Sequence, residues 1–135
     1  MNTKIASPVH IASALITDEN GEILLLKRSM NNKSRVGMWQ FPEGKVHPGE
    51  TPLSAIKREL KEEIGIEKMG RKIGVFPFKI SVLGVNIHSK RHLYKVPVPK
   101  EIILSQEHSE YKWFSKKEAL GLRLNAGIRE IISAL

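Results

Sequence analysis

The sequence predicts one domain of the α/β (α+β) class, built around a mixed β-sheet. The chain has 135 residues, of which 41% are hydrophobic, and that is enough to form a core without disulfides or a structural metal. Runs rich in β-branched residues alternate with segments of helical periodicity. Because no internal repeat or Pro/Gly/Ser linker divides the chain, we expect a loose leader over residues 1–8 and one domain over residues 9–135.

The N-terminal third predicts strands separated by turns and loops. We expect strands over residues 9–17, 22–28 and 38–41. Asp18-Glu19-Asn20-Gly21 joins the first two, and its Asn-Gly pair is typical of a β-hairpin. The polar residues 29–37 predict a surface loop, and Pro42 ends the third strand. The two glycines and the proline within residues 43–50 predict a shaped loop without regular structure.

Residues 52–64 have the clearest helix pattern. Thr51 is a typical N-cap, and Pro52 suits the first helical position. Gly65 stands where a C-terminal cap is expected. On a helical projection one apolar stripe forms, made of Leu53, Ile56, Leu60 and Ile64.

The C-terminal half predicts three further strands and two short helices. The strands are expected over residues 72–82, 86–96 and 111–114. A capping-box pattern, Ser115-Lys116-Lys117-Glu118, starts a brief helix that Gly121 ends. Asn125 is a candidate cap for a last helix. That helix would bury Ile128, Ile131, Ile132 and Leu135.

Three carboxylates share one face of the helix over residues 52–64. Glu59, Glu62 and Glu63 border its apolar stripe, where burial and mutual repulsion are costly unless a cation is bound. Oxygen ligands of this kind suit Mg²⁺ or Mn²⁺. The alternative is an ordinary solvated face with pairs such as Arg58 with Glu62. The Gly- and Pro-bearing loop in front of the helix favours a site, because it offers backbone groups beside the carboxylates.

A longer motif contains this helix. Gly44, five residues, Glu50, seven residues and then Arg58-Glu59-Leu60-Lys61-Glu62-Glu63-Ile64-Gly65-Ile66 match the Nudix box at every defined position. The chain therefore resembles the Nudix hydrolase family, in its MutT-like form. This resemblance implies a Nudix-like α/β/α sandwich with a central mixed β-sheet. It also implies an enzyme that hydrolyses a nucleoside diphosphate linked to another group.

The resemblance also assigns roles within the motif. In the family the glutamates of the box hold Mg²⁺ or Mn²⁺. The metal ligands implied here are Glu59, Glu62, Glu63 and the carbonyl of Gly44. Arg58 would orient the glutamates, with Glu50 as its ion-pair partner.

A further acid is expected outside the motif. The segment from Gln106 to Trp113 resembles the family's Glu-His-x-Glu-x-x-Trp segment. Glu107 is therefore a candidate metal ligand or catalytic base, with Glu110 as second choice. Alternatively, either residue is an ordinary acidic residue of a surface loop, without a role in a site.

Two residues are candidates for substrate binding. Arg28 matches a position that contacts phosphate in MutT-type members, and a guanidinium suits that role; a surface arginine is the alternative. Asn125 resembles an asparagine that reads the base in some members, against its alternative as a helix cap.

The substrate class is open at the level of sequence. The short MutT-sized chain favours nucleoside triphosphates, cleaved to a nucleoside monophosphate and pyrophosphate. However, Pro42-Glu43-Gly44 stands where MutT-type enzymes usually have Pro-Gly-Gly, and this departure is similar to dinucleoside polyphosphate hydrolases and RNA 5′-pyrophosphohydrolases. A net charge of +8 also favours a polyanionic substrate such as RNA, although solubility alone explains such a charge equally well. A nucleotide- or RNA-binding module without catalysis is the remaining alternative.

Composition excludes several other classes. The chain has no cysteine, so disulfides, Cys-ligated zinc, iron–sulfur clusters and thiol nucleophiles are ruled out. No apolar run approaches the ~20 residues that span a bilayer, so we expect no membrane partner. We expect a cytoplasmic protein, monomeric or homodimeric.

Overall fold

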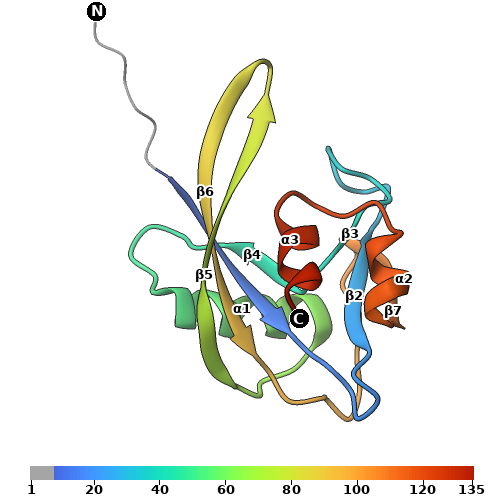
Figure 1. The fold of residues 1–135 in the computed structure, drawn as a ribbon. Coiled ribbons are helices and arrows are strands. Elements are labelled where there is room, and N and C mark those ends of the chain that lie inside the picture. Colours follow the sequence, from blue (N-terminus) through green and yellow to red (C-terminus); the bar gives the residue numbers. More distant parts are fainter. Residues whose placement is uncertain (1–7) are drawn as a thin grey trace, which may run out of the picture.

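A computed structural model describes residues 8–135 (Figure 1). The leader expected over residues 1–8 lies, apart from Pro8, outside the described residues. The elements in chain order are β1 (Val9–Leu15), β2 (Ile23–Arg28), β3 (Trp39–Gln40), β4 (Glu43–Lys45), α1 (Pro52–Ile64), β5 (Arg71–Val82), β6 (Val85–Lys95), β7 (His108–Phe114), α2 (Lys116–Leu120) and α3 (Ile128–Ser133). None of the helices between residues 8 and 135 has the length and apolar character needed to cross a membrane.

The strands form two sheets. The central sheet has four strands in the order β4-β1-β6-β5, and it is mixed because β1 and β6 run parallel while the other pairs are antiparallel. The predicted central mixed sheet is therefore confirmed. A smaller antiparallel sheet, β3-β2-β7, lies beside it. The two sheets form two β layers, which diverge from the turn after β1 (Figure 1).

The expected hairpin over Asp18–Gly21 forms only at its closed end. Thr17 and Ile23 make an isolated antiparallel bridge, and the amide of Asp18 donates to the carbonyl of Glu22 over 3.0 Å. Beyond this bridge β1 and β2 separate. They separate because both edges of β1 are paired with β4 and β6, while both edges of β2 are paired with β3 and β7.

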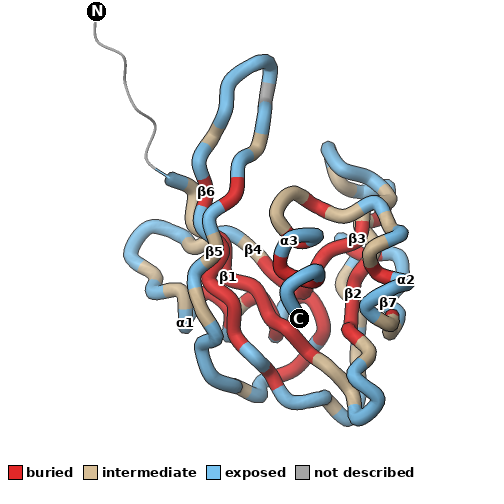
Figure 2. The backbone as a smooth tube through the Cα atoms, viewed as in Figure 1, coloured by how far each residue is buried: buried red, intermediate tan, exposed pale blue. Residues whose placement is uncertain are grey.

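Helices cover both sides of the sheets. α1 packs on β1 and β4, and its buried side chains share a core with β1, β2 and the end of β6. On the other side α2 and α3 bury Ala119, Ile128, Ile131 and Ile132 against Leu15, Leu25, Trp39, Phe41, Leu93 and Phe114. The buried residues accordingly lie along β1 and β2, in the middle of the molecule (Figure 2). This layering is the expected α/β/α arrangement.

α1 begins and ends where the sequence predicts. The Thr51 hydroxyl accepts from the amide of Ser54 over 3.1 Å, and the Ser54 hydroxyl accepts from the amide of Thr51 over 3.1 Å. At the other end Gly65 has φ 72°, and its amide donates to the carbonyls of Leu60 and Lys61. Local capping therefore fixes which residues of α1 face the sheet.

Three local expectations are wrong. The loop expected over residues 43–50 contains β4, because the backbone of residues 43–45 pairs with β1. Asn125 does not cap the last helix: Gly127, with φ 84°, is the N-cap, and a Cβ there would lie 2.7 Å from the Cβ of Phe78. The side chain of Leu135 is not buried with the last helix, because α3 ends at Ser133 and Leu135 is 50% exposed.

Candidate active site

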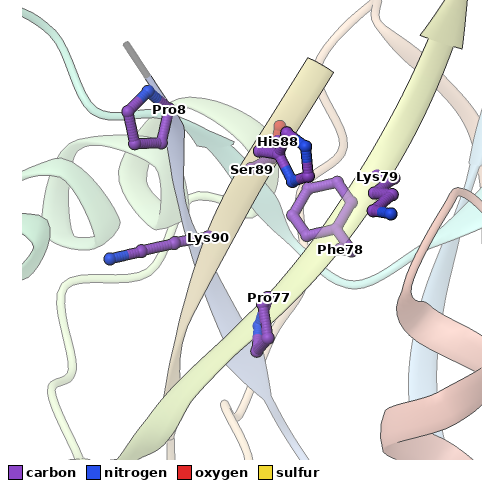
Figure 3. Close-up of a pocket in the computed structure, with 7 residues that line it drawn as sticks. All are labelled: Pro8, Pro77, Phe78, Lys79, His88, Ser89 and Lys90. Carbon is purple, nitrogen blue, oxygen red and sulfur yellow. The ribbon is translucent and has the colours of Figure 1, made fainter. Parts of the chain in front are cut away.

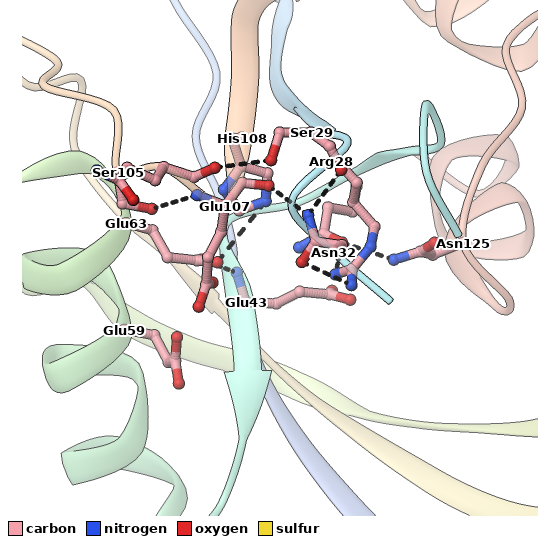
Figure 4. A network of polar contacts seen from close by, with 12 residues as sticks. Arg28, Ser29, Asn32, Glu43, Glu59, Glu63, Ser105, Glu107, His108 and Asn125 are labelled. Carbon is pink, nitrogen blue, oxygen red and sulfur yellow. Dashed lines mark hydrogen bonds and ion pairs between the residues drawn. The ribbon is translucent and has the colours of Figure 1, made fainter. Parts of the chain in front are cut away.

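The motif residues meet other acids and amides around one cavity of about 340 Å³. Glu59 and Glu63 reach it from α1, Gly44 from β4, and Glu107 from the loop before β7. Arg28 and Asn125 lie on the side of the cavity opposite Glu59 and Glu63 (Figure 4). The remaining lining residues are Ile11, Asn32, Arg35, Gln40, Glu43, Lys45 and His47. The cavity thus brings acidic, basic and amide side chains together, with Glu59 and Glu63 on one side and Arg28 and Asn125 on the other.

Glu63 is the most buried acid of the site, with 2% of its surface exposed. Its Oε1 accepts a hydrogen bond from the Glu43 amide over 2.8 Å, and Oε2 lies 3.8 Å from Nε2 of His108. Burial, and then the charge of Glu59, raises the pKa of Glu63 well above its usual value. Burial and the charge of Arg28 lower the pKa of His108 to about 4. His108 is therefore neutral at pH 7 and does not balance the charge of Glu63.

Arg58 links two acids of the motif. Its Nε and Nη2 donate to the two carboxylate oxygens of Glu50, each over 2.9 Å, which is the ion pair expected from the sequence. Its Nη1 donates to Oε1 of Glu59 over 2.6 Å, and Nη2 also donates to the carbonyl of Lys45 over 3.0 Å. The hydrogen bonds from Arg58, and then from the amide of His47, lower the pKa of Glu50 to about 2. Arg58 is thus fixed by four acceptors and holds the Glu59 carboxylate in place.

Glu59 retains unbalanced charge despite this contact. Its side chain is largely buried, and burial raises its pKa even though the hydrogen bond from Arg58 acts in the opposite direction. Two buried carboxylates, Glu59 and Glu63, therefore share one end of the cavity. A divalent cation between oxygen ligands compensates charge of this kind, so the donor chemistry fits Mg²⁺ or Mn²⁺.

Gly44 lies directly against Glu59. A Cβ built on Gly44 would lie 2.1 Å from Cδ of Glu59 and 2.2 and 2.6 Å from its two carboxylate oxygens. No side chain fits there unless the carboxylate moves. The glycine of the motif is therefore explained by the close approach of the β4 backbone to this carboxylate.

We expect Gly44→Ala to lower turnover by about tenfold to a hundredfold, because displacing a reacting group by about 1 Å has effects of this size. The change in the free energy of unfolding should stay small, since the methyl group meets the end of a flexible side chain and no backbone atom. Gly121→Ala is the matched control, because a Cβ there meets only the carbonyl of Glu118 at 3.4 Å. Steady-state kinetics and thermal melts of both variants check this, and equal activities would contradict the placement of Gly44.

Glu62 lies apart from the other two glutamates of the box. Its side chain is 60% exposed and lies 3.5 Å from Nη1 of Arg58, outside the lining of the cavity. Among residues 8–135, no three acidic, His or Cys side chains already stand close enough to enclose a metal ion. Glu59, Glu63 and Glu107 line the same cavity, and Glu62 does not. The assignment of Glu62 as a ligand stays a prediction.

The loop that bears Glu107 is fixed from two directions. The carbonyl of Glu107 accepts from the Ser29 amide over 2.9 Å and from Nδ2 of Asn32 over 2.6 Å. The amide of Ser105 donates to the carbonyl of Glu63 over 3.0 Å, which ties the same loop to the end of α1. The Glu107 side chain itself remains exposed at the cavity.

Glu110, the second choice of the sequence, occupies a different place. It lies within β7, opposite Lys27 of β2, and does not line the cavity. Of the two candidate acids, only Glu107 is therefore within reach of the group formed by Glu59 and Glu63.

Arg28 and Asn125 meet through a residue that the sequence did not single out. The Oε1 of Gln40 accepts from Nδ2 of Asn125 over 2.7 Å and from Nη1 of Arg28 over 3.2 Å. Arg28 also donates through Nη2 to Oδ1 of Asn32 over 3.1 Å. Among residues 8–135, the buried Oδ1 of Asn125 has no hydrogen-bond partner. The only sequence signal for Gln40 was an amide side chain in an otherwise apolar short strand.

A second residue missed by the sequence is Arg91 of β6, which is 1% exposed. Its Nε donates to Oε1 of Glu43 over 3.0 Å and to the Ser13 hydroxyl over 3.1 Å, and its Nη2 donates to Oε2 of Glu43 over 3.1 Å. Its Nη1 donates to the carbonyl of Ala126 over 2.9 Å. Glu43, whose amide holds Glu63, is therefore fixed by a buried ion pair.

Comparison with known proteins supports the motif. A family model described as the NUDIX domain matches residues 8–135. The CTP pyrophosphohydrolase of Escherichia coli (strain K12) is 33% identical over 108 residues, which cover 79% of this chain and 76% of that protein. The RNA pyrophosphohydrolase of Acinetobacter baylyi (strain ATCC 33305 / BD413 / ADP1) is 44% identical over 52 residues, 38% of this chain and 28% of that protein.

A solved structure agrees over nearly the whole chain. The crystal structure of a MutT protein from Methanosarcina mazei Go1 superposes with a TM-score of 0.79 at 32% identity, covering 97% of this chain and 95% of that one. The chain thus shares its fold with a MutT protein and most of its length with a relative named as a pyrophosphohydrolase. The chain belongs to the NUDIX family and is a hydrolase of phosphoanhydride bonds in nucleotide-linked substrates.

Proposed function

We propose that this hydrolase is a Mg²⁺-dependent pyrophosphohydrolase of nucleoside triphosphates, which releases a nucleoside monophosphate and pyrophosphate. The observation that carries the proposal is the pair of buried carboxylates, Glu59 and Glu63, facing Arg28 and Asn125 across one cavity of about 340 Å³. That volume is within the range of small-ligand sites. A relative aligned over 76% of its length is named for CTP, which supports this substrate class.

Each residue has a defined task in this proposal. Glu59, Glu63 and the carbonyl of Gly44 hold the cation, with Glu62 as a further ligand. When bound, the cation supplies positive charge to the phosphate oxygens, and Mn²⁺ satisfies the same oxygen ligands as Mg²⁺.

The remaining residues position the substrate and move the proton. Arg28 donates hydrogen bonds to a phosphate group that enters the cavity. Glu107, exposed at the cavity, accepts the proton of the attacking water. The free Oδ1 of Asn125 accepts a hydrogen bond from an amino group of the base. Because nucleoside triphosphates are the substrates, we place the enzyme in the cytoplasm.

The RNA 5′ end is the second candidate substrate. The argument from Glu43 that favoured it no longer separates the classes, because the Glu43 carboxylate is bound to Arg91 within the protein. What favours RNA is the excess of positive charge over residues 68–100, which contain eight Lys or Arg residues and no Asp or Glu. A relative named as an RNA pyrophosphohydrolase also matches part of the chain.

A substrate panel tests the proposal. Nucleoside triphosphates, a dinucleoside tetraphosphate and a 5′-triphosphorylated oligoribonucleotide are incubated with Mg²⁺, with Mn²⁺ and with a chelator, and the products are identified by chromatography. We expect monophosphate and pyrophosphate from the triphosphates, and no turnover with the chelator. Release of a nucleoside triphosphate from the tetraphosphate, with free triphosphates left intact, would replace this substrate class by the dinucleoside polyphosphates.

A further inference from the structure

The excess positive charge of the chain comes from one segment. Residues 68–100 contain eight of the 22 Lys and Arg residues and none of the Asp or Glu residues. The rest of the chain is balanced, with 14 basic and 14 acidic residues. The net charge of +8 therefore belongs to this segment.

Residues 71–95 of the segment form the β5–β6 hairpin and carry six of these eight cations, of which Arg91 is buried against Glu43. This hairpin extends beyond the central sheet (Figure 1), and most of its outer part is exposed (Figure 2). The parallel partner of β6 begins at Val9, opposite Ser89, so the hairpin beyond that pair has two strands only. Lys79 is exposed there, and Lys90 is exposed just inside it, opposite His10 of β1. The whole hairpin thus carries five exposed cations and no acid, and such a surface attracts polyanions, an attraction that salt weakens.

A cavity of about 360 Å³ lies at the base of the projecting part (Figure 3). Its lining includes the exposed residues Pro77, Lys79, His88 and Lys90 and the buried residues Phe78 and Ser89. A cavity flanked by exposed cations suits one nucleotide of a single strand, whose phosphates pair with lysine.

The base of the hairpin is joined to the wall of the candidate active site. Phe78 lies under the guanidinium of Arg91, 4.3 Å from ring centroid to Cζ. Arg91 in turn donates to the carbonyl of Ala126, next to Asn125 in the cavity lining. A strand whose first nucleotide occupies the candidate active site thus has the hairpin close to its exit.

We propose that the β5–β6 hairpin is a docking surface for the backbone of single-stranded RNA. The RNA would continue from a 5′ end held in the candidate active site, and this part rests on the second candidate substrate of the proposed function. Lys79 and Lys90 pair with phosphates, and the cavity between them takes one nucleotide.

The test measures binding without hydrolysis. A short fluorescent oligoribonucleotide with a 5′-hydroxyl contains no phosphoanhydride bond, so its anisotropy on titration with the full chain reports docking alone. We expect the double variant Lys79→Gln/Lys90→Gln to bind the RNA about tenfold more weakly, or worse, near 0.1 M salt. The slope of the logarithm of the binding constant against the logarithm of the salt concentration should fall by about 1.4, because each phosphate contact on a single strand contributes about 0.7. Lys57→Gln/Lys117→Gln, which removes two exposed lysines from the balanced part of the chain, should bind as the wild type does.

Three results would overturn the inference. The first is a wild-type chain that does not bind the oligonucleotide even at about 50 mM salt, where phosphate contacts are strong. The second is an equal loss of affinity in the two double variants. The third is a hairpin variant that loses binding to phosphatidylserine vesicles but keeps its affinity for RNA. A chain that binds the 5′-hydroxyl RNA but hydrolyses no nucleotide would instead contradict the proposed function alone.

Discussion

Glu63→Gln is expected to lower turnover by about a hundredfold or more, because even residues that only support a metal ligand contribute 10- to 100-fold. The side-chain oxygen of the new glutamine can still accept from the Glu43 amide, a bond of 2.8 Å in the wild type, so the fold should stay intact. What is lost is the negative charge that holds the cation. Glu59→Gln should behave in the same way, since Glu59 shares the buried end of the cavity.

The same substitution should stabilise the metal-free protein at neutral pH. Burial raises the pKa of Glu63, so the folded chain holds its proton to a higher pH than the unfolded chain does. The stability of the wild type therefore falls as pH rises from the unfolded value of about 4.3 up to the raised folded pKa. Glutamine has no such proton to lose, and it avoids this penalty. Its side-chain amide can also donate to Nε2 of His108, which lacks a hydrogen-bond partner among the described residues.

Kinetics and thermal melts together test both effects. In a chelator at pH 7 the midpoint of Glu63→Gln should lie above that of the wild type, and the gap should close as the pH falls toward about 4. Added Mg²⁺ should raise the midpoint of the wild type and leave that of the variant nearly unchanged. Glu67→Gln is the matched control, because Glu67 is an exposed acid paired with Lys61 outside the cavity. If Glu63→Gln keeps near wild-type rates at saturating Mg²⁺, the site is wrongly assigned.

Features fixed by neighbouring residues were predictable from the sequence. α1 spans the predicted residues because Thr51, Pro52 and Gly65 act within one turn of its ends. The pair between Arg58 and Glu50 was also expected, because the resemblance to the Nudix box implies it.

Features that depend on distant contacts were not predictable. Asn125 suited a helix cap by its type, yet its side chain bonds to Gln40, which is 85 positions away. The strand β4 forms only because β1 pairs with it, and its own residues favour a loop. The helical projection placed Glu62 beside Glu59, but it could not show that Arg58 lies between Glu62 and the cavity side chains. Tertiary contacts decide such positions, so one sequence leaves them open.

The buried pair of Arg91 and Glu43 explains a sequence feature that looked like a substrate signal. A glutamate stands before Gly44, and its carboxylate is enclosed with Arg91, whose side chain is 2% exposed, while that of Glu43 is 6% exposed. Both carboxylate oxygens of Glu43 accept from the guanidinium, and the Ser13 hydroxyl donates to Oε1 over 2.7 Å. Because the Glu43 amide holds Glu63, the pair also positions the catalytic end of the cavity.

Arg91→Met should therefore cost about 3–5 kcal/mol of unfolding free energy, because it leaves the Glu43 carboxylate buried without its cation. This is a large part of the roughly 5–15 kcal/mol that stabilises a domain. The single variant Glu43→Leu should be destabilised for the converse reason. The double variant Glu43→Leu/Arg91→Met should regain most of the loss, since replacing both ions by apolar side chains is often neutral.

Urea unfolding of the wild type, the two single variants and the double variant measures the coupling between the two residues. The turnover of the double variant shows whether the ion pair acts only through the fold or also through the position of Glu63. In the double variant the Glu43 amide is kept, so a restored fold with restored turnover means that the ion pair acts only by keeping this backbone in place. A restored fold with low turnover means that the charges themselves help to set the position of Glu63. A loss below about 1 kcal/mol in Arg91→Met would show that Arg91 and Glu43 are not the enclosed pair that the structure describes, since an unpaired buried charge costs more than that.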